Sequence, residues 1–200
     1  MKKIGITGGI GSGKTTICEI FKLLGVAVFQ ADEVGRNLQM NDVNIKKQLI
    51  HRFGEDIYAI DGLLNRKKLA DRVFSDPKAL ADLNGIIHPA VRQTFLNWVE
   101  MHRNDPYVIY EAAILFESGY VSDFDKIILV MANEEIRIKR VIGRDQTSRS
   151  LVEKRIKNQM SDNRKKKLAD YVIENNNKEL IIPQIIDLDR LLLQANEINV

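Results

Sequence analysis

Cysteine, net charge and long apolar runs are all scarce in this sequence. The single cysteine, Cys18, excludes an internal disulfide and is typical of proteins in a reducing compartment. A formal net charge of +3 over 200 residues is too small to indicate a nucleic-acid partner by itself. No apolar run approaches the ~18 residues that span a bilayer, and no signal-peptide pattern follows Met1. We therefore expect a cytoplasmic protein, a monomer or weak homo-oligomer, with neither a nucleic-acid nor a membrane partner.

Hydrophobic residues are plentiful, at 44% of the chain, which is sufficient for one sizeable core with one or two inserted subdomains. Short apolar runs with strand character alternate with helical periodicity, a pattern typical of an α/β fold. The expected strands lie at residues 2–7, 26–29, 107–110, 126–131 and 169–175, and a closing amphipathic helix at 181–193.

A glycine-rich stretch between the first expected strand and the first helix organises the chain. Residues 8–15, GGIGSGKT, fit the phosphate-binding pattern G-x-x-x-x-G-K-[ST] in the strand–loop–helix setting that the motif requires. Glycines let the backbone wrap around a phosphate, and successive N–H groups at the helix N-terminus bind its charge. We expect Lys14 to contact the β- and γ-phosphates of a nucleoside triphosphate, and the Thr15 hydroxyl to bind Mg²⁺.

The second expected strand delivers Asp32 to the sheet edge at which open α/β proteins bind ligands. Asp32 has two interpretations. As a helix N-cap, it would satisfy backbone N–H groups of the helix that it opens. As a catalytic carboxylate, it would face the phosphate loop across the sheet edge. The two roles are compatible, and the sequence position does not choose between them.

Residues 41–103 have a helical and polar pattern without a strand. A stretch of about sixty such residues indicates a helical insertion, which would lie over the active-site edge and hold an acceptor substrate. His88 and Pro89 are expected to end one helix and begin the next, with Arg92 one turn further on. His88 and Arg92 are either a helix-end histidine and a surface arginine or a pair that binds an anionic acceptor.

Two acids follow the third expected strand. Glu111 ends the strand, where phosphate-loop proteins place a carboxylate that organises Mg²⁺, so it either holds a metal-bound water or orients the substrate. The other interpretation is an acid exposed to solvent. Glu117 lies beyond a short apolar run and is either a second acid near the acceptor or a residue without a role in the site.

Residues 134–167 contain short, highly charged helices that have the character of a mobile flap. Arg140 and Arg144 lie one helical turn apart on one face, and we expect them to close on a triphosphate and neutralise developing charge. Ser148 or Ser150 is expected to cap the following helix, which would run to about Met160. The lysines at 165–167 are interpreted as an ordinary solvated helix face.

Together, these features resemble those of the dephospho-coenzyme A kinase family, over nearly the whole chain. The matching stretches are 7–15 (TGGIGSGKT), 31–36 (ADEVGR), 87–92 (IHPAVR), 115–119 (LFESG), Arg140-Val141 with Arg144, Arg155 with Gln159, and 169–175 (ADYVIEN). One stretch departs from the family, which usually has Asp-x-Pro-Leu-Leu-Phe-Glu where this chain has EAAILFE at 111–117.

The resemblance implies a P-loop NTPase fold, that is, a three-layer α/β/α core around a five-stranded parallel sheet. It also implies a helical substrate-binding insertion and a helical lid. The expected boundaries are 1–31, 105–136 and 168–200 for the nucleotide-binding core, 32–104 for the acceptor domain and 137–167 for the lid.

The implied reaction moves the γ-phosphoryl of ATP, with Mg²⁺, to the 3′-hydroxyl of the ribose of dephospho-coenzyme A, which is the last step of coenzyme A synthesis. The residues expected to bind ATP are Gly11, Ser12, Gly13, Lys14, Thr15, Thr16, Arg144 and Asn175. The expected catalytic groups are Asp32, Lys14 and Arg140. The residues expected to bind the acceptor are Asp32, His88, Arg92, Glu111 and Glu117.

Three other functions are compatible with parts of this pattern. A nucleoside or nucleoside-monophosphate kinase shares the core and the lid, but the apparent acceptor insertion favours the coenzyme A precursor. A GTPase-like switch needs an Asn-Lys-x-Asp type loop, which the sequence lacks. A nucleic-acid-binding module would use the basic region 154–167, and the weak net charge argues against it.

Overall fold

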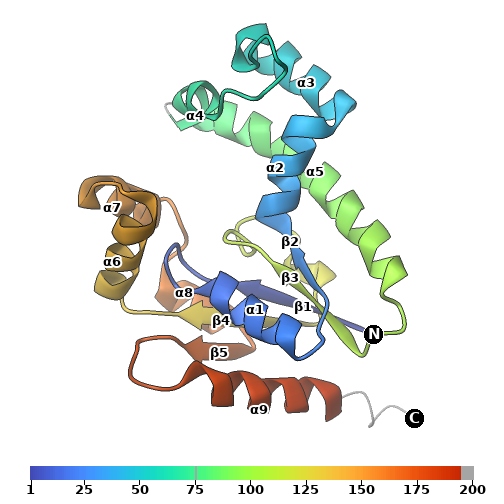
Figure 1. The fold of residues 1–200 in the computed structure, drawn as a ribbon, viewed down its shortest axis with the longest axis vertical. Helices are drawn as coiled ribbons and strands as arrows, with labels where there is room; N and C mark the ends of the chain where they lie inside the picture. The colour runs from blue at the N-terminus through green and yellow to red at the C-terminus, as the bar shows by residue number, and fades with distance from the viewer. Residues whose placement is uncertain (75, 195–200) are drawn as a thin grey trace. The chain divides into compact units, whose positions relative to one another are not determined.

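The computed structural model describes residues 1–74 and 76–194, and the chain folds as two compact units (Figure 1). The first unit consists of Met1–Gln30 and His102–Val200, and the second of Ala31–Met101. The strands that the structure describes belong to the first unit, whereas the second is built from helices. The chain thus leaves the first unit at the end of its second strand and returns before its third.

A parallel sheet with the strand order β2-β3-β1-β4-β5 forms the centre of the first unit. Its strands are β1 (Lys2–Thr7), β2 (Val28–Gln30), β3 (Tyr107–Glu111), β4 (Lys126–Met131) and β5 (Tyr171–Glu174). The middle strand, β1, is buried on both faces from Ile4 to Thr7, as expected where both sides of a sheet are covered. The predicted five-stranded parallel sheet and the α/β class are confirmed.

Helices α1 and α9 pack against one hydrophobic cluster of the sheet (Figure 1). The helices of this unit are α1 (Lys14–Leu23), α6 (Glu134–Asp145), α7 (Arg149–Lys157), α8 (Asp162–Leu168) and α9 (Ile181–Gln194). Cys18 on α1 is fully buried in the cluster, where burial and, to a smaller extent, the charge of Glu111 raise the pKa of its thiol to about 12. Cys18 is therefore a packed thiol that stays protonated at neutral pH.

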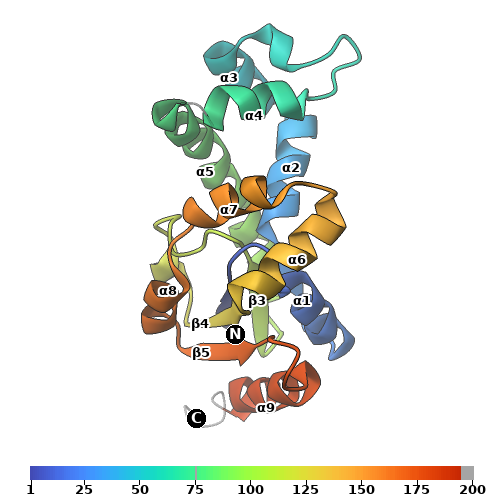
Figure 2. The same cartoon turned by 90° about the vertical axis from the view of Figure 1, so that its left-hand side faces the viewer.

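Helices α6 and α7 form a pair with a hydrophobic cluster of its own, made by Ile138, Val141 and Val152 (Figure 2). Ser148 is the N-cap of α7, because its Oγ accepts a hydrogen bond from the Leu151 N–H at 3.4 Å. The alternative cap, Ser150, lies inside the helix. The expected end of this helix near Met160 is wrong, since α7 ends at Lys157.

In the second unit, the last three helices each begin with a side chain that caps the helix N-terminus. Its helices are α2 (Ala31–Asn41), α3 (Val43–Phe53), α4 (Arg66–Phe74) and α5 (Pro77–Met101). Asp42 accepts hydrogen bonds from two N–H groups at the start of α3. Asn65 accepts one from Lys68 at 3.0 Å in α4, and Asp76 accepts one from Lys78 at 2.8 Å in α5. Each cap satisfies a donor that the helix itself leaves unpaired.

The prediction that one helix ends and another begins at His88–Pro89 is wrong, because α5 continues through Pro89. Proline has no N–H, so the helical bond to the Gly85 carbonyl is lost there. Tertiary packing outweighs that loss. Ile87 and Val91, on either side of the proline, belong to one buried stripe that continues to Val99.

Among residues 1–74 and 76–194, no helix is both long enough and apolar enough to cross a membrane.

A substitution at Pro89 tests whether the packing of α5 outweighs the hydrogen bond that the proline removes. Replacing Pro89 by Ala restores the helical N–H and should raise the free energy of unfolding by about 1–2 kcal/mol, as measured in urea. Pro77→Ala is the matched control. Pro77 is the first residue of α5, where the N–H has no helical partner, so no gain is expected. An equal effect of the two substitutions would contradict this account.

Candidate active site

The phosphate loop, residues 8–15, has the backbone conformation that its glycines make possible. Gly11 and Gly13 adopt left-handed φ angles of 78° and 98°, and the Ser12 N–H donates to the Gly9 carbonyl at 3.1 Å. Helix α1 starts directly after this turn, and its cap residue Gly13 supplies no side-chain acceptor. The N–H groups of the first turn are thus positioned for an anion.

Side chains on and beneath the loop supply its charge and its oxygen donors. The Lys14 ammonium donates to the Gly8 carbonyl at 2.9 Å, so it already lies along the loop. Thr15 is exposed in the first turn of α1. The Ser12 hydroxyl is buried, with no hydrogen-bond partner among the described residues.

Arg140 and Asn175 both contact the loop. The Arg140 guanidinium donates to the carbonyls of Gly11 and Ser12 at 3.4 and 3.3 Å. It also donates to the Asn175 carbonyl at 3.1 Å and to the Asn177 side chain at 2.7 Å. Asn175 follows β5, is buried, and donates from its Nδ2 to the Ser12 carbonyl at 2.8 Å. Helix α6 and the end of β5 are thereby joined at the loop.

Arg144, one turn beyond Arg140, is instead paired with its neighbour Asp145 at 2.7 Å. Asp145 also pairs with Arg155 at 3.0 Å. The hydrogen bond from Arg144, more than that from Arg155, lowers the pKa of the Asp145 carboxyl. The structure therefore brings Arg140 to the loop and leaves Arg144 in an ion-pair cluster with α7.

Two further side chains, neither of them predicted to contact the loop, form hydrogen bonds with its Ile10 peptide. Arg137, with 3% of its side chain exposed, donates from Nε to the Ile10 carbonyl at 2.9 Å. Gln159 accepts the Ile10 N–H at its Oε1, also at 2.9 Å. A Cβ added to Gly9 would lie 2.2 Å from the Arg137 guanidinium, so this position leaves room for the arginine. The spacing of Arg137 and Arg140 on one helix face is the one signal that could have indicated Arg137.

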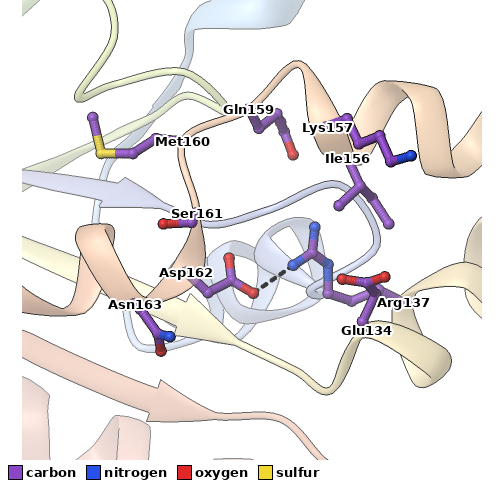
Figure 3. A pocket seen from close by; sticks show the side chains of 9 residues that line it. All are labelled: Glu134, Arg137, Ile156, Lys157, Gln159, Met160, Ser161, Asp162 and Asn163. Atoms are coloured by element: carbon purple, nitrogen blue, oxygen red, sulfur yellow. Dashed lines mark hydrogen bonds and ion pairs between the residues drawn. The ribbon is translucent and has the colours of Figure 1, made fainter.

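Arg137 and Gln159 also line a pocket of about 400 Å³ beside the loop (Figure 3). The Arg137–Asp162 ion pair, at 2.5 Å, connects α6 to α8 at its wall. The remaining lining residues are Glu134, Ile156, Lys157, Met160, Ser161 and Asn163.

Glu111 lies at the end of β3, in register with Ile6 of β1 and Gln30 of β2. It is only 6% exposed, so the interpretation of a solvent-exposed strand-end acid is wrong. The charge of Glu111 also raises the pKa of the Cys18 thiol on α1. The Glu111 carboxylate and the Thr15 hydroxyl are oxygen donors of the kind that Mg²⁺ prefers. The described residues contain no group of three or more His, Cys, Asp or Glu side chains arranged around a metal position.

Glu117 and Lys165 form an ion pair at 3.4 Å in which the lysine is fully buried. Glu117 also accepts the Met160 N–H at 2.9 Å. The interpretation of residue 165 as part of a solvated face is wrong, because α8 packs on β4 and turns Lys165 inward. Lys166 and Lys167 are exposed, as expected.

The second unit holds the other predicted residues. Asp32 is exposed in the first turn of α2, and the interpretation of Asp32 as the N-cap is wrong, because the helix already begins at Ala31. Burial lowers the pKa of His88 on α5, and the charge of Asp32 partly opposes that shift. A Cβ on Gly35 would lie 3.5 Å from the side chains of Ile87 and Val91, so α2 and α5 pack closely beside this pair. Asp32 and His88 are thus brought together, with Arg92 half-buried one turn further on. Their relation to the phosphate loop stays a prediction.

The strand order and the glycine-rich loop after β1 define the phosphate-loop class of α/β folds. Shikimate kinase from Bacteroides thetaiotaomicron has a similar fold, with a TM-score of 0.52 at 14% identity over 96% of this chain and 98% of that one. A narrower assignment comes from the family model described as dephospho-CoA kinase, which matches residues 2–180. The chain belongs to the dephospho-CoA kinase family.

Individual relatives agree with the family match. The dephospho-CoA kinase of Bacteroides fragilis (strain YCH46) is 38% identical over 192 residues, which is 96% of this chain and 93% of that protein. The enzyme named so in Fusobacterium nucleatum is 39% identical over 86% of this chain and 89% of its own. A crystal structure from Thermus thermophilus has a TM-score of 0.79 at 34% identity, covering 100% of this chain and 98% of that one. The dephospho-CoA kinase structure from Campylobacter jejuni has a TM-score of 0.70 at 25% identity, covering 97% and 98%.

The pKa shift of His88 predicts a pH dependence of stability. Its pKa in the folded state lies below the ordinary 6.5, so the unfolded chain binds more protons between these two values. The stabilisation from neutral His88 is therefore complete above pH 6.5 and is lost as the pH falls below it. Urea unfolding of the wild type and His88→Gln should show the wild type losing more stability between pH 8 and pH 5.5. Parallel pH profiles for the two proteins would refute the assignment.

Proposed function

We propose that this chain transfers the γ-phosphoryl group of ATP to the 3′-hydroxyl of the ribose of dephospho-coenzyme A, giving coenzyme A and ADP. This reaction is the last step of coenzyme A synthesis. The observation that carries the proposal is the family match over residues 2–180, because it includes the phosphate loop, most of the first unit and the whole helical unit. The loop geometry supports it independently, since it offers backbone N–H groups and an ammonium to a triphosphate.

Phosphoryl transfer depends mainly on positioning and on neutralising charge. In our proposal, the residues from Gly11 to Thr16 hold the phosphates of ATP, and Lys14 bridges the β- and γ-phosphates. Arg140, which already lies against the loop, stabilises the transferring group. Asn175 supports the nucleotide site from the end of β5. We also propose that Arg144 contacts ATP, which requires it to leave its partner Asp145.

Phosphate-loop kinases generally use ATP with a divalent metal, and we propose Mg²⁺ bound through the Thr15 hydroxyl. When bound, this ion neutralises charge on the phosphate oxygens. Glu111 would hold a water of the ion or orient the substrate, and its burial at the end of β3 supports either role.

The helical unit, in this proposal, is the acceptor domain over residues 32–104, and residues 137–167 form the lid. Asp32 accepts or orients the proton of the acceptor hydroxyl. His88 and Arg92, one turn apart on α5, bind the anionic acceptor, and the effect of the Asp32 charge on His88 supports this role. We also place the protein in the cytoplasm, as a monomer or weak homo-oligomer. Its single buried thiol, Cys18, fits a reducing compartment.

A comparison of acceptors tests the reaction. ATP consumption with Mg²⁺ should be stimulated by dephospho-coenzyme A, with coenzyme A as the product, and not by AMP, CMP or adenosine. The rival kinase, which acts on a nucleoside or nucleoside monophosphate, is not favoured by the family match. It would be stimulated by one of those acceptors instead, and that result would overturn the acceptor assignment.

A second test addresses Asp32. Asp32→Ala should lower kcat at least ~100-fold if the carboxylate works as a general base, while the KM for ATP changes little. Glu33→Ala is the matched control, because Glu33 is the next exposed acid in the same helical turn and has no assigned role. Near-normal turnover by a folded Asp32→Ala variant would exclude the catalytic role.

A further inference from the structure

We propose that Gln159, Glu117 and Lys165 are positioning residues that set the backbone geometry of the phosphate loop, and with it the affinity for ATP. With Arg137 and Asp162, we call them the loop brace. Because the ligand is ATP, this inference rests on the function proposed above. It gives Glu117 a role that acts through the loop in place of a contact with the acceptor.

The Ile10 peptide is the point at which the brace holds the loop. Its N–H donates to Gln159 and its carbonyl accepts from Arg137, each at 2.9 Å. Both groups of this residue are therefore bonded to side chains outside the loop. Gly11 follows directly with its left-handed φ of 78°, so the orientation of Ile10 sets the start of the N–H array.

Gln159 is itself fixed by its neighbour in the chain. It lies between α7 and α8, where its own N–H donates to the Ile156 carbonyl at 3.0 Å. The next N–H, that of Met160, donates to the Glu117 carboxylate at 2.9 Å. Glu117 thus ties the α7–α8 connection to the segment that follows β3. Moving the Glu117 carboxylate would move Gln159 and release Ile10.

Lys165 fixes the Glu117 carboxylate in turn. Its side chain is 0% exposed, and its ammonium lies 3.4 Å from Glu117 Oε1 and 3.5 Å from the Ala113 carbonyl. A buried ammonium is unfavourable without an opposite charge, so the pair holds both residues in place. Arg137 and Asp162 form the second part of the brace. Arg137 donates to the Ile10 carbonyl and pairs with Asp162, which connects the same peptide to α8.

The first test removes the bond at the loop. Gln159→Met keeps the side-chain length and removes the acceptor for the Ile10 N–H. ATP binding, measured by calorimetry with Mg²⁺ and without acceptor, should weaken about three- to tenfold, the effect of one hydrogen bond. The KM for dephospho-coenzyme A should stay unchanged. Asn163→Ala is the matched control, because Asn163 is exposed and lines the same pocket outside the brace, and it should bind ATP as the wild type does.

The second test uses the buried pair. Glu117→Gln keeps an oxygen for the Met160 N–H but leaves Lys165 without its charge partner, so ATP binding should weaken about tenfold. Adding Lys165→Met removes the unpaired ammonium and should restore most of the affinity. A Glu117 that contacts the acceptor directly would behave differently, because its loss would raise the acceptor KM and Lys165→Met would not rescue it.

Several results would overturn the inference. The inference would be wrong if Gln159→Met bound ATP with wild-type affinity, or if Glu117→Gln changed only the KM for the acceptor. It would also be wrong if the double variant Glu117→Gln, Lys165→Met bound ATP no more tightly than Glu117→Gln alone. Circular dichroism and a thermal melt check that each variant is folded. If the wild type bound ATP but did not phosphorylate dephospho-coenzyme A, the proposed function would fail and the binding test would still stand.

Discussion

Hydrogen bonds from surrounding side chains fix the loop at residues 8–15, and the rest of this structure depends on them. A glycine-rich backbone has few side chains with which to fix itself, and it gains little from local conformational preference. Its geometry therefore comes from elsewhere in the first unit. Helix α6 reaches it through Arg137 and Arg140, the end of β5 through Asn175, and the α7–α8 connection through Gln159. Three segments distant in sequence thus converge on one turn of chain.

The glycines of the loop have a second use besides wrapping a phosphate. Their missing side chains leave space that neighbouring groups occupy. A Cβ on Gly9 would meet the Arg137 guanidinium, and one on Gly13 would meet the Asn175 amide, each at 2.2 Å. The loop is therefore packed closely on its protein side while its N–H groups stay arranged for an anion. This is how a flexible sequence becomes a preorganised binding site.

The sheet, the loop and Arg140 could be predicted because each depends on local pattern. Apolar runs indicate buried strands, the glycine spacing indicates the loop, and the arginine lies on one face of a charged helix. The continuous α5 and the buried Lys165 could not, because both depend on what packs against them. The apolar spacing of Ile87 and Val91 is visible around Pro89, but whether their burial outweighs the missing bond depends on what packs against them. Similarly, Lys165 has the same local surroundings as its exposed neighbours Lys166 and Lys167.

The bond from Lys14 to its own Gly8 carbonyl has a thermodynamic consequence. The ammonium is already oriented and already partnered before any nucleotide arrives, so little side-chain entropy remains to be lost. An ammonium has three N–H donors, so Lys14 can keep the Gly8 bond and still donate to phosphate oxygens. In the proposed complex, the triphosphate therefore meets a lysine whose direction along the loop is already fixed, and binding costs little further loss of side-chain freedom.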